Sequence, residues 1–93
     1  MKNKIFKKIK INEVTLKNRF VVSPMCQYSS SDGSPTSWHY KHLTSLGNSG
    51  AGLLMIEATA IEKRGKITHS DMCLENNTQF KNLKKLVKNL RKT

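Results

Sequence analysis

The sequence predicts an α/β fold in which short apolar strands alternate with helices, and two observations carry this prediction. Two continuous apolar segments, 20–22 and 52–58, have the pattern of strands covered on both faces of a parallel sheet. Each is followed by a segment with apolar residues at helical spacing, 36–48 and 79–90. The order strand, helix, strand, helix is typical of parallel sheets with crossover helices.

Ahead of these units, the first 18 residues predict a small hairpin. Residues 8–12 and 14–18 alternate apolar and polar side chains, which is the period of a half-exposed strand. Asn12 and Glu13 are expected to form the tight turn between them. We therefore expect one domain, in which residues 1–18 form a hairpin plug and residues 19–93 form two βα units.

The first helix is expected to start at Thr36 or Ser37, since either hydroxyl can cap a helix. It should end before the glycines at 47, 50 and 52. A phosphate-binding fingerprint follows a strand and opens a helix, whereas these glycines precede a strand, so they indicate a helix-to-strand turn. Residues 59–78 are polar and are expected to be irregular.

The second helix is expected to begin near Gln79 and to be amphipathic. Its apolar face comprises Phe80, Leu83, Leu86, Val87 and Leu90. Lysines and one arginine occupy the other face, which we interpret as the solvated side of an outer helix.

Two strands and two helices cannot complete a parallel sheet, because both apolar strands require neighbours at their edges. A (β/α)₈ barrel needs about 250 residues, and this chain has 93. We expect an N-terminal hairpin plus the first two βα units of a TIM barrel, incomplete in this chain. A truncated gene product or a partial sequence would have this form.

The net charge of +11 suggests nucleic-acid binding, but its distribution argues against it. Residues 1–19 and 81–93 each carry a balance of +6, while residues 20–80 carry −1. Nucleic-acid-binding surfaces combine basic and aromatic side chains, and the two terminal segments hold few aromatic residues. We expect no nucleic-acid partner.

The number of cysteines and the hydropathy of the chain indicate the cellular compartment. Cys26 and Cys73 are too few for a disulfide framework, and no apolar run has the length of a signal peptide core or a membrane span. We expect a cytoplasmic protein with free thiols and no membrane association.

The segment 19–28 is the strongest candidate for a site. The apolar strand 20–22 ends in Ser23 and Pro24, and proline stops a strand because it lacks an amide hydrogen. A thiol, Cys26, and a phenol, Tyr28, follow at once. Parallel-sheet enzymes place their chemistry in such loops after strands.

These residues resemble a known family. The sequence is similar to the N-terminal part of the Old Yellow Enzyme family, NADH:flavin oxidoreductases that act as ene-reductases, and most of all to its bacterial, thermophilic-like branch. The resemblance covers residues 6–90, and its most specific blocks are Ser-Pro-Met-Cys-Gln-Tyr at 23–28 and Glu-Ala-Thr-Ala at 57–60.

The resemblance implies a TIM barrel that binds FMN at the C-terminal ends of its strands. NADPH or NADH would reduce the flavin, which would pass a hydride to an activated alkene such as an enone. Cofactor contacts would come from Ser23, Pro24, Met25, Cys26 and Ala58. Cys26 would also tune the flavin potential, and Tyr28 would donate a hydrogen bond to the substrate carbonyl.

Other parts of the family's site have no counterpart in these 93 residues. The resemblance places the substrate-binding histidine pair, the proton-donating tyrosine and the phosphate site further along the barrel, and it implies homo-oligomeric full-length relatives. As an isolated polypeptide, the chain is expected to lack turnover. Alternatives are a non-catalytic fragment that folds with a partner supplying the remaining strands and, remotely, a basic nucleic-acid-binding module.

The histidines do not predict a metal site. His39 and His42 lie three residues apart on the expected helix, which could present both to one ion. A metal site needs a further ligand, and no motif supplies one. We therefore interpret both as structural and expect no bound metal.

Overall fold

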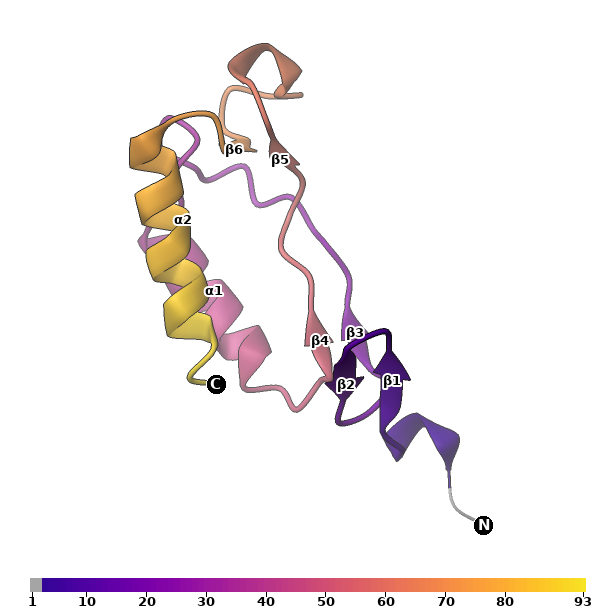
Figure 1. Cartoon of the computed structure of the whole chain (residues 1–93). Coiled ribbons are helices and arrows are strands. Elements are labelled where there is room, and N and C mark those ends of the chain that lie inside the picture. Colours follow the sequence, from indigo (N-terminus) through magenta and orange to yellow (C-terminus); the bar gives the residue numbers. More distant parts are fainter. Residues whose placement is uncertain (1–2) are drawn as a thin grey trace.

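Figure 1 shows the computed structural model, which describes residues 3–93 as an elongated arrangement of short elements. Its principal extents are 49 × 23 × 21 Å, and its radius of gyration is 14.9 Å. A compact domain of this length would have a radius of gyration of about 12 Å. Residues 1 and 2, with which the predicted segment 1–18 begins, lie outside the described residues.

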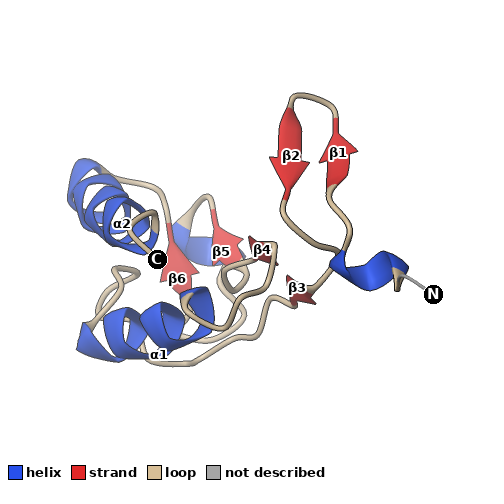
Figure 2. Ribbon diagram, turned by 90° about the horizontal axis from the view of Figure 1, so that it is seen from below, coloured by secondary structure: helices blue, strands red, loops and turns tan. Residues whose placement is uncertain are grey.

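The predicted hairpin is confirmed. Strand β1 (Ile9–Ile11) pairs antiparallel with β2 (Val14–Leu16), with Ile9 opposite Leu16. The turn places Asn12 at a φ of 52°, in the left-handed region that asparagine tolerates better than most residues. Figure 2 shows this hairpin standing away from the remaining elements.

A short 3₁₀ helix, η1 (Lys4–Phe6), precedes the hairpin and was not predicted. The rings of Phe6 and Phe20 lie 5.7 Å apart, and the Arg19 amide donates to the Ile5 carbonyl. These contacts attach the N-terminal segment to the start of the first barrel-type strand.

The predicted parallel pair is also confirmed, although its ladder is short. Strand β3 (Val21–Val22) pairs parallel with β4 (Leu53–Leu54), with Val21 opposite Leu53. Only two residues of the predicted strand 52–58 lie in the ladder. Gly52 is required at its start, because a Cβ there would lie 2.5 Å from the carbonyl oxygen of Asn18.

The expectation that these strands are buried on both faces is not met within this chain. Val21 is 50% exposed, and Phe20, Leu53 and Met55 are exposed as well. The apolar side chains are present as predicted, but among residues 3–93 nothing pairs with the outer edges of β3 and β4. Their exposure follows from the small number of strands.

The two helices pack side by side at one side of the molecule (Figure 1). Helix α1 (Ser37–Gly47) begins where it was predicted but includes Gly47, which was expected to follow it, and α2 (Asn77–Leu90) begins two residues earlier than predicted. The early start arises because the Asn76 side chain accepts from the Gln79 amide as an N-cap. Leu43 and Leu86 are buried.

The segment 59–78, which was predicted to be irregular, contains further structure. Strands β5 (Thr59–Ala60) and β6 (Met72–Cys73) form a parallel pair, and the 3₁₀ helix η2 (Lys63–Gly65) lies between them. Met72 and Cys73 are buried. These strands lie in a polar segment and lack the continuous apolar run that predicts β3 and β4.

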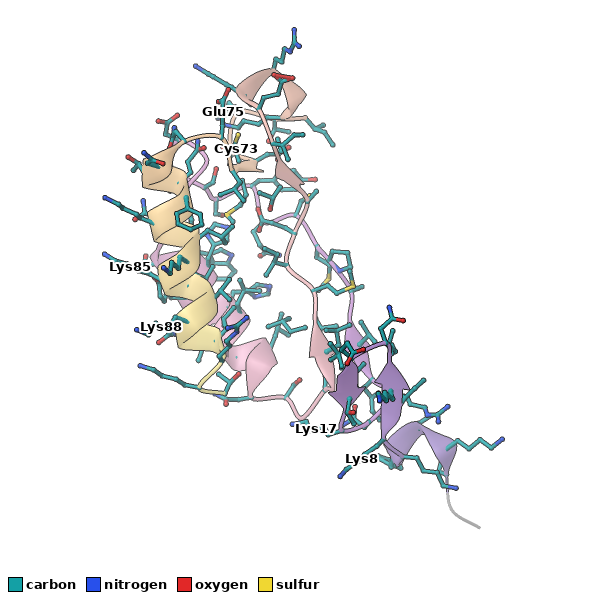
Figure 3. All side chains as sticks on the ribbon, viewed as in Figure 1. Lys8, Lys17, Cys73, Glu75, Lys85 and Lys88 are labelled. Carbon is teal, nitrogen blue, oxygen red and sulfur yellow. The ribbon has the colours of Figure 1, made fainter. Side chains whose placement is uncertain are left out.

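The basic side chains fall into two groups, as the charge count predicts. Figure 3 places Lys85 and Lys88 on α2 and Lys8 and Lys17 beside the hairpin, on opposite sides of the view. Within residues 3–93, no helix is long and apolar enough to cross a membrane.

Candidate functional site

The predicted site residues lie where two parallel strands end. Residues 23–28 follow β3 directly, and Ala58 follows β4 after a short extended segment. Because β3 and β4 are parallel, both segments emerge at the C-terminal end of the strand pair. The structure therefore brings the two predicted blocks, 23–28 and 57–60, to one end of the strands.

Most of the predicted residues in this loop are accessible. Ser23, Pro24, Met25 and Ala58 are exposed, and Cys26 is half-buried. In the part of the chain that the structure describes, the Met25 and Cys26 amides donate no hydrogen bond to another residue. The loop thus presents apolar side chains together with free backbone donors.

Tyr28 has an unusual backbone conformation. Its φ is 53°, in the left-handed region that non-glycine residues rarely adopt, and its side chain is 61% exposed. Such residues persist only where surrounding contacts over-determine them, and they cluster at functional sites. The phenol is therefore presented outward by a strained turn.

Gln27 connects the loop to α1. Its side-chain Oε1 accepts from Trp38 Nε1 at 2.9 Å, and its Nε2 donates to the Met25 carbonyl at 2.9 Å. The Trp38 indole in turn stacks on His42, with ring centroids 5.4 Å apart and planes 11° apart. Both polar atoms of the Gln27 side-chain amide therefore make hydrogen bonds that hold the loop.

A buried carboxylate and imidazole lie behind the loop. His39 Nε2 is 3.2 Å from Glu57 Oε2, and His39 and Glu57 are 0% and 6% exposed. The Thr36 backbone N–H donates to His39 Nδ1 at 3.0 Å, so Nδ1 carries no proton. A neutral imidazole must then carry its proton on Nε2, facing Glu57.

The surroundings of this pair shift both groups toward their neutral forms. Burial, followed by the nearby His42, lowers the pKa of His39. Burial also raises the pKa of Glu57, and Asp71 adds to this, while the Gln27 backbone N–H and His42 act in the opposite direction. The two groups lie in contact, but His39 Nε2 makes no hydrogen bond within residues 3–93.

The site's role is clarified by its relatives. Residues 4–93 match the NADH:flavin oxidoreductase / NADH oxidase family. The chain belongs to this family. The expected cofactors, FMN with NADPH or NADH, agree with this family.

Similar proteins are found among bacteria and fungi. The chain is 46% identical over 90 residues to an NADPH dehydrogenase of Listeria monocytogenes serotype 4b, covering 95% of this chain and 27% of the relative. It is 43% identical over 83 residues to an NADH:flavin oxidoreductase of Gibberella zeae, covering 89% of this chain and 20% of the relative. The chain thus spans about a quarter of the length of such relatives.

Solved structures agree on the fold. Old Yellow Enzyme from Pichia sp. AKU4542 has a TM-score of 0.87 at 27% identity, and the match covers 96% of this chain and 23% of that one. Morphinone reductase in complex with tetrahydroNAD has a TM-score of 0.86 at 19% identity, and the match covers 98% of this chain and 24% of that one. The α/β prediction is confirmed at this level, since the chain has the structure of part of an Old Yellow Enzyme barrel.

The residues present fit a flavin of this family. A flavin ring system is flat and apolar on its faces and polar along its edge. Exposed Met25 and Ala58 provide apolar surface, and the free amides of Met25 and Cys26 provide donors.

His39 and His42, the two histidines that could suggest a metal site, contact other side chains of the protein. No group of three or more potential metal-ligating side chains occurs in residues 3–93. Both ring nitrogens of His39 face partners within the protein, Thr36 and Glu57. His42 lies against Trp38.

Sequence reasoning missed two members of the site. Neither Glu57 nor Gln27 has a role predicted from the sequence. Glu57 does carry a signal, since an acid at the end of an apolar run will be buried and buried acids require partners. His39 was interpreted as structural, but its link to Glu57 cannot be read from spacing.

Proposed function

We propose that this chain forms the N-terminal hairpin and the first two βα units of an FMN-dependent TIM-barrel oxidoreductase. The proposed reaction transfers a hydride from NADPH or NADH to an activated alkene such as an enone, and bound FMN would supply the redox chemistry. The observation that carries this proposal is that residues 23–28 and Ala58 both follow the C-terminal ends of a parallel strand pair.

Each residue has a role within this proposal. Ser23, Pro24, Met25 and Ala58 would hold the flavin, and Cys26 would lie against it and tune its potential. Tyr28 would donate a hydrogen bond to the substrate carbonyl, for which its exposed phenol is suitable. A donor at that oxygen withdraws electron density from the alkene and favours hydride addition.

We also propose that the 93-residue polypeptide alone has no turnover. The residues that would grip the substrate oxygen and the flavin phosphate have no counterpart in it, and the chain spans 27% of the Listeria relative. Cytoplasmic location and homo-oligomeric assembly of the complete enzyme stay predictions from the sequence.

A second candidate is a non-catalytic fragment that folds with a partner supplying the remaining strands. The exposed apolar residues of β3 and β4 favour it, because open apolar strand edges bind or aggregate with other strands. The two candidates are compatible, since the same partner strands would complete the barrel.

The test joins residues 1–93 to the remaining three quarters of the Listeria NADPH dehydrogenase. We expect the fusion to bind FMN and to reduce 2-cyclohexenone with NADPH, while the 93-residue chain does neither at a measurable rate. A fusion that folds but holds no FMN would contradict the proposed function, and turnover by the isolated chain would contradict its predicted inactivity.

Variants of the fusion test the individual roles. Tyr28→Phe should raise the KM for the enone by about tenfold, because one hydrogen bond is lost. Tyr40→Phe in α1 removes the same hydroxyl away from the loop and should leave KM unchanged. Cys26→Ala should change the flavin midpoint potential, and an unchanged potential would argue against its role.

A further inference from the structure

The side chain of Gln27 connects helix α1 to the peptide unit between Met25 and Cys26. Its Oε1 accepts from Trp38 Nε1 at 2.9 Å, and its Nε2 donates to the Met25 carbonyl at 2.9 Å. An indole N–H can only donate and a carbonyl can only accept, so a flipped Gln27 amide would lose both hydrogen bonds. Trp38 therefore determines that the donor end of the Gln27 amide faces Met25.

The hydrogen bond to Met25 also fixes the direction of a backbone donor. The Met25 carbonyl and the Cys26 N–H belong to one peptide unit, which is planar and trans. These two groups point in opposite directions, so a Met25 carbonyl held toward the Gln27 side chain turns the Cys26 N–H away from it. In the described part of the chain this N–H donates to no other residue, which leaves it available to a ligand.

The end of the loop is attached to the same helix. Ser29 Oγ donates to the Gln27 carbonyl at 2.8 Å, and Thr36 Oγ1, at the start of α1, donates to the Ser29 carbonyl at 3.0 Å. Trp38 is itself held by stacking on His42, one helical turn further along, with ring centroids 5.4 Å apart. The first turn of α1 thus holds the loop at two points.

We propose that Gln27 and Trp38 are positioning residues: the indole N–H orients the Gln27 side chain, which in turn aims the Cys26 N–H at the flavin. This inference rests on the proposed function, because it concerns the cofactor contacts of the same loop. Trp38 is 44% exposed, so its replacement should act on the loop through the lost hydrogen bond more than through lost burial.

The first test measures hydrogen exchange of the Trp38 indole N–H by ¹⁵N NMR on the 93-residue chain. Trp38 is the only tryptophan, so its indole signal is unambiguous. In wild type the indole should exchange about tenfold more slowly than free tryptophan, and Gln27→Met, which removes the acceptor, should abolish this protection.

Tyr40→Phe is the control for the exchange measurement. It removes a hydroxyl from the same helix, two residues further along, and should leave the indole exchange as in wild type. A wild-type indole that exchanges like free tryptophan overturns the proposal, and so does equal exchange in wild type and Gln27→Met.

The second test measures FMN affinity and the flavin midpoint potential in the fusion with the Listeria enzyme. Gln27→Met and Trp38→Phe should each weaken FMN binding by about tenfold, because a hydrogen bond that orders the loop is lost. Both should also make the potential more negative, since an aimed N–H stabilises the electron-rich reduced ring. Tyr40→Phe should change neither quantity.

A double variant decides whether Trp38 acts through Gln27. If it does, Gln27→Met combined with Trp38→Phe should bind FMN as Gln27→Met alone does, because both changes break the same connection. A double variant whose loss is the product of the two single losses overturns the proposed route.

The remaining outcomes separate this inference from the proposed function. Equal FMN affinity and potential in wild type and Gln27→Met overturn the inference and leave the proposed function standing. If Gln27→Met does not fold, Trp38→Phe decides in the same way, because Trp38 lies outside the loop. A wild-type fusion that folds but holds no FMN refutes the proposed function, and this inference falls with it.

Discussion

The chain has two regions that differ in how they bury their apolar residues. The helix-side region, residues 29–47 and 57–93, contains the three largest fully buried side chains, Met72, Leu86 and His39. The strand-side region, residues 3–22 and 50–56, contains one buried apolar residue, Leu16, and leaves most of its large apolar side chains exposed.

Contacts within the chain hold the core of the helix-side region together, although Ile61, Ile67 and Phe80 are exposed there. Gln79 Nε2 donates to the Asp32 carbonyl at 2.9 Å, and the Cys73 amide donates to the Gly33 carbonyl at 3.0 Å. Gly33, with a φ of 80°, is required there because a Cβ would lie 2.5 Å from Gln79 Nε2. The loop after the proposed flavin segment is thus fixed by α2 and β6.

The strand-side region depends on elements of a larger barrel. Two parallel strands have two outer edges and four faces, and one hairpin with one helix pair cannot cover them. The difference between the regions therefore teaches that local helix packing can form within a quarter of the barrel, whereas its central strands require neighbours.

The largest expected effect is the loss of a core leucine on the helix side. Leu86 is fully buried, so Leu86→Ala should lower the free energy of unfolding by about 2–5 kcal/mol through lost burial and a residual cavity. Urea unfolding followed by circular dichroism at 222 nm measures it. Given the low stability of small domains, the variant will be largely unfolded.

The comparable substitution in the strand-side region is Leu53→Ala. Leu53 is 37% exposed, so the same truncation should lower the free energy of unfolding by about 1 kcal/mol, less than Leu86→Ala. In the fusion with the Listeria enzyme, Leu53→Ala should become as damaging as Leu86→Ala. Equal effects of the two changes in the isolated chain would remove the distinction between the regions.

A smaller expected effect is the pH dependence of the free energy of unfolding. The folded state lowers the pKa of His39 below its ordinary value of 6.5, so below that pH the unfolded chain binds a proton that the folded chain resists. His39 therefore contributes stability that is present above pH 6.5 and is lost as the pH falls. Glu57, with its raised pKa, opposes this: its contribution improves as the pH falls toward 4.5.

His39→Gln separates the two contributions. It should remove the loss of stability between pH 6.5 and 4.5, measured by urea midpoints at several pH values. His69→Gln is the control and should keep the wild-type slope, since the His69 side chain is exposed and only its carbonyl accepts a hydrogen bond. An unchanged slope in His39→Gln would show that the buried imidazole is not titrating as the structure implies.

The sequence predicts elements with strong periodicity and misses those without it. The hairpin, α1, α2 and the β3–β4 pairing all follow from period and residue type. The β5–β6 pair does not, because its strands lie in the polar segment 59–78, without the continuous apolar run that marks β3 and β4. Burial of β3 and β4 was also predicted, but burial depends on strands this chain does not contain.

The same limit applies to the site. Ser23 to Tyr28 are contiguous, so a motif identifies them, and their roles stay predictions. The contact of His39 with Glu57 joins residues 18 positions apart, and the hydrogen bond of Trp38 with Gln27 joins residues 11 positions apart. These are ordinary residue types, and the parallel pairing of β3 with β4 brings Glu57 behind the loop.

The smallest effect tests whether α2 is stabilised at its start as well as through its core. Asn76 Oδ1 accepts from the Gln79 amide at 2.9 Å, so Asn76→Ala should lower the free energy of unfolding by about 1 kcal/mol. Asn77→Ala, one residue inside the helix, should change it much less, because Asn77 caps nothing. Similar losses in both variants would show that the core contacts of Leu86, rather than the cap, determine where the helix begins.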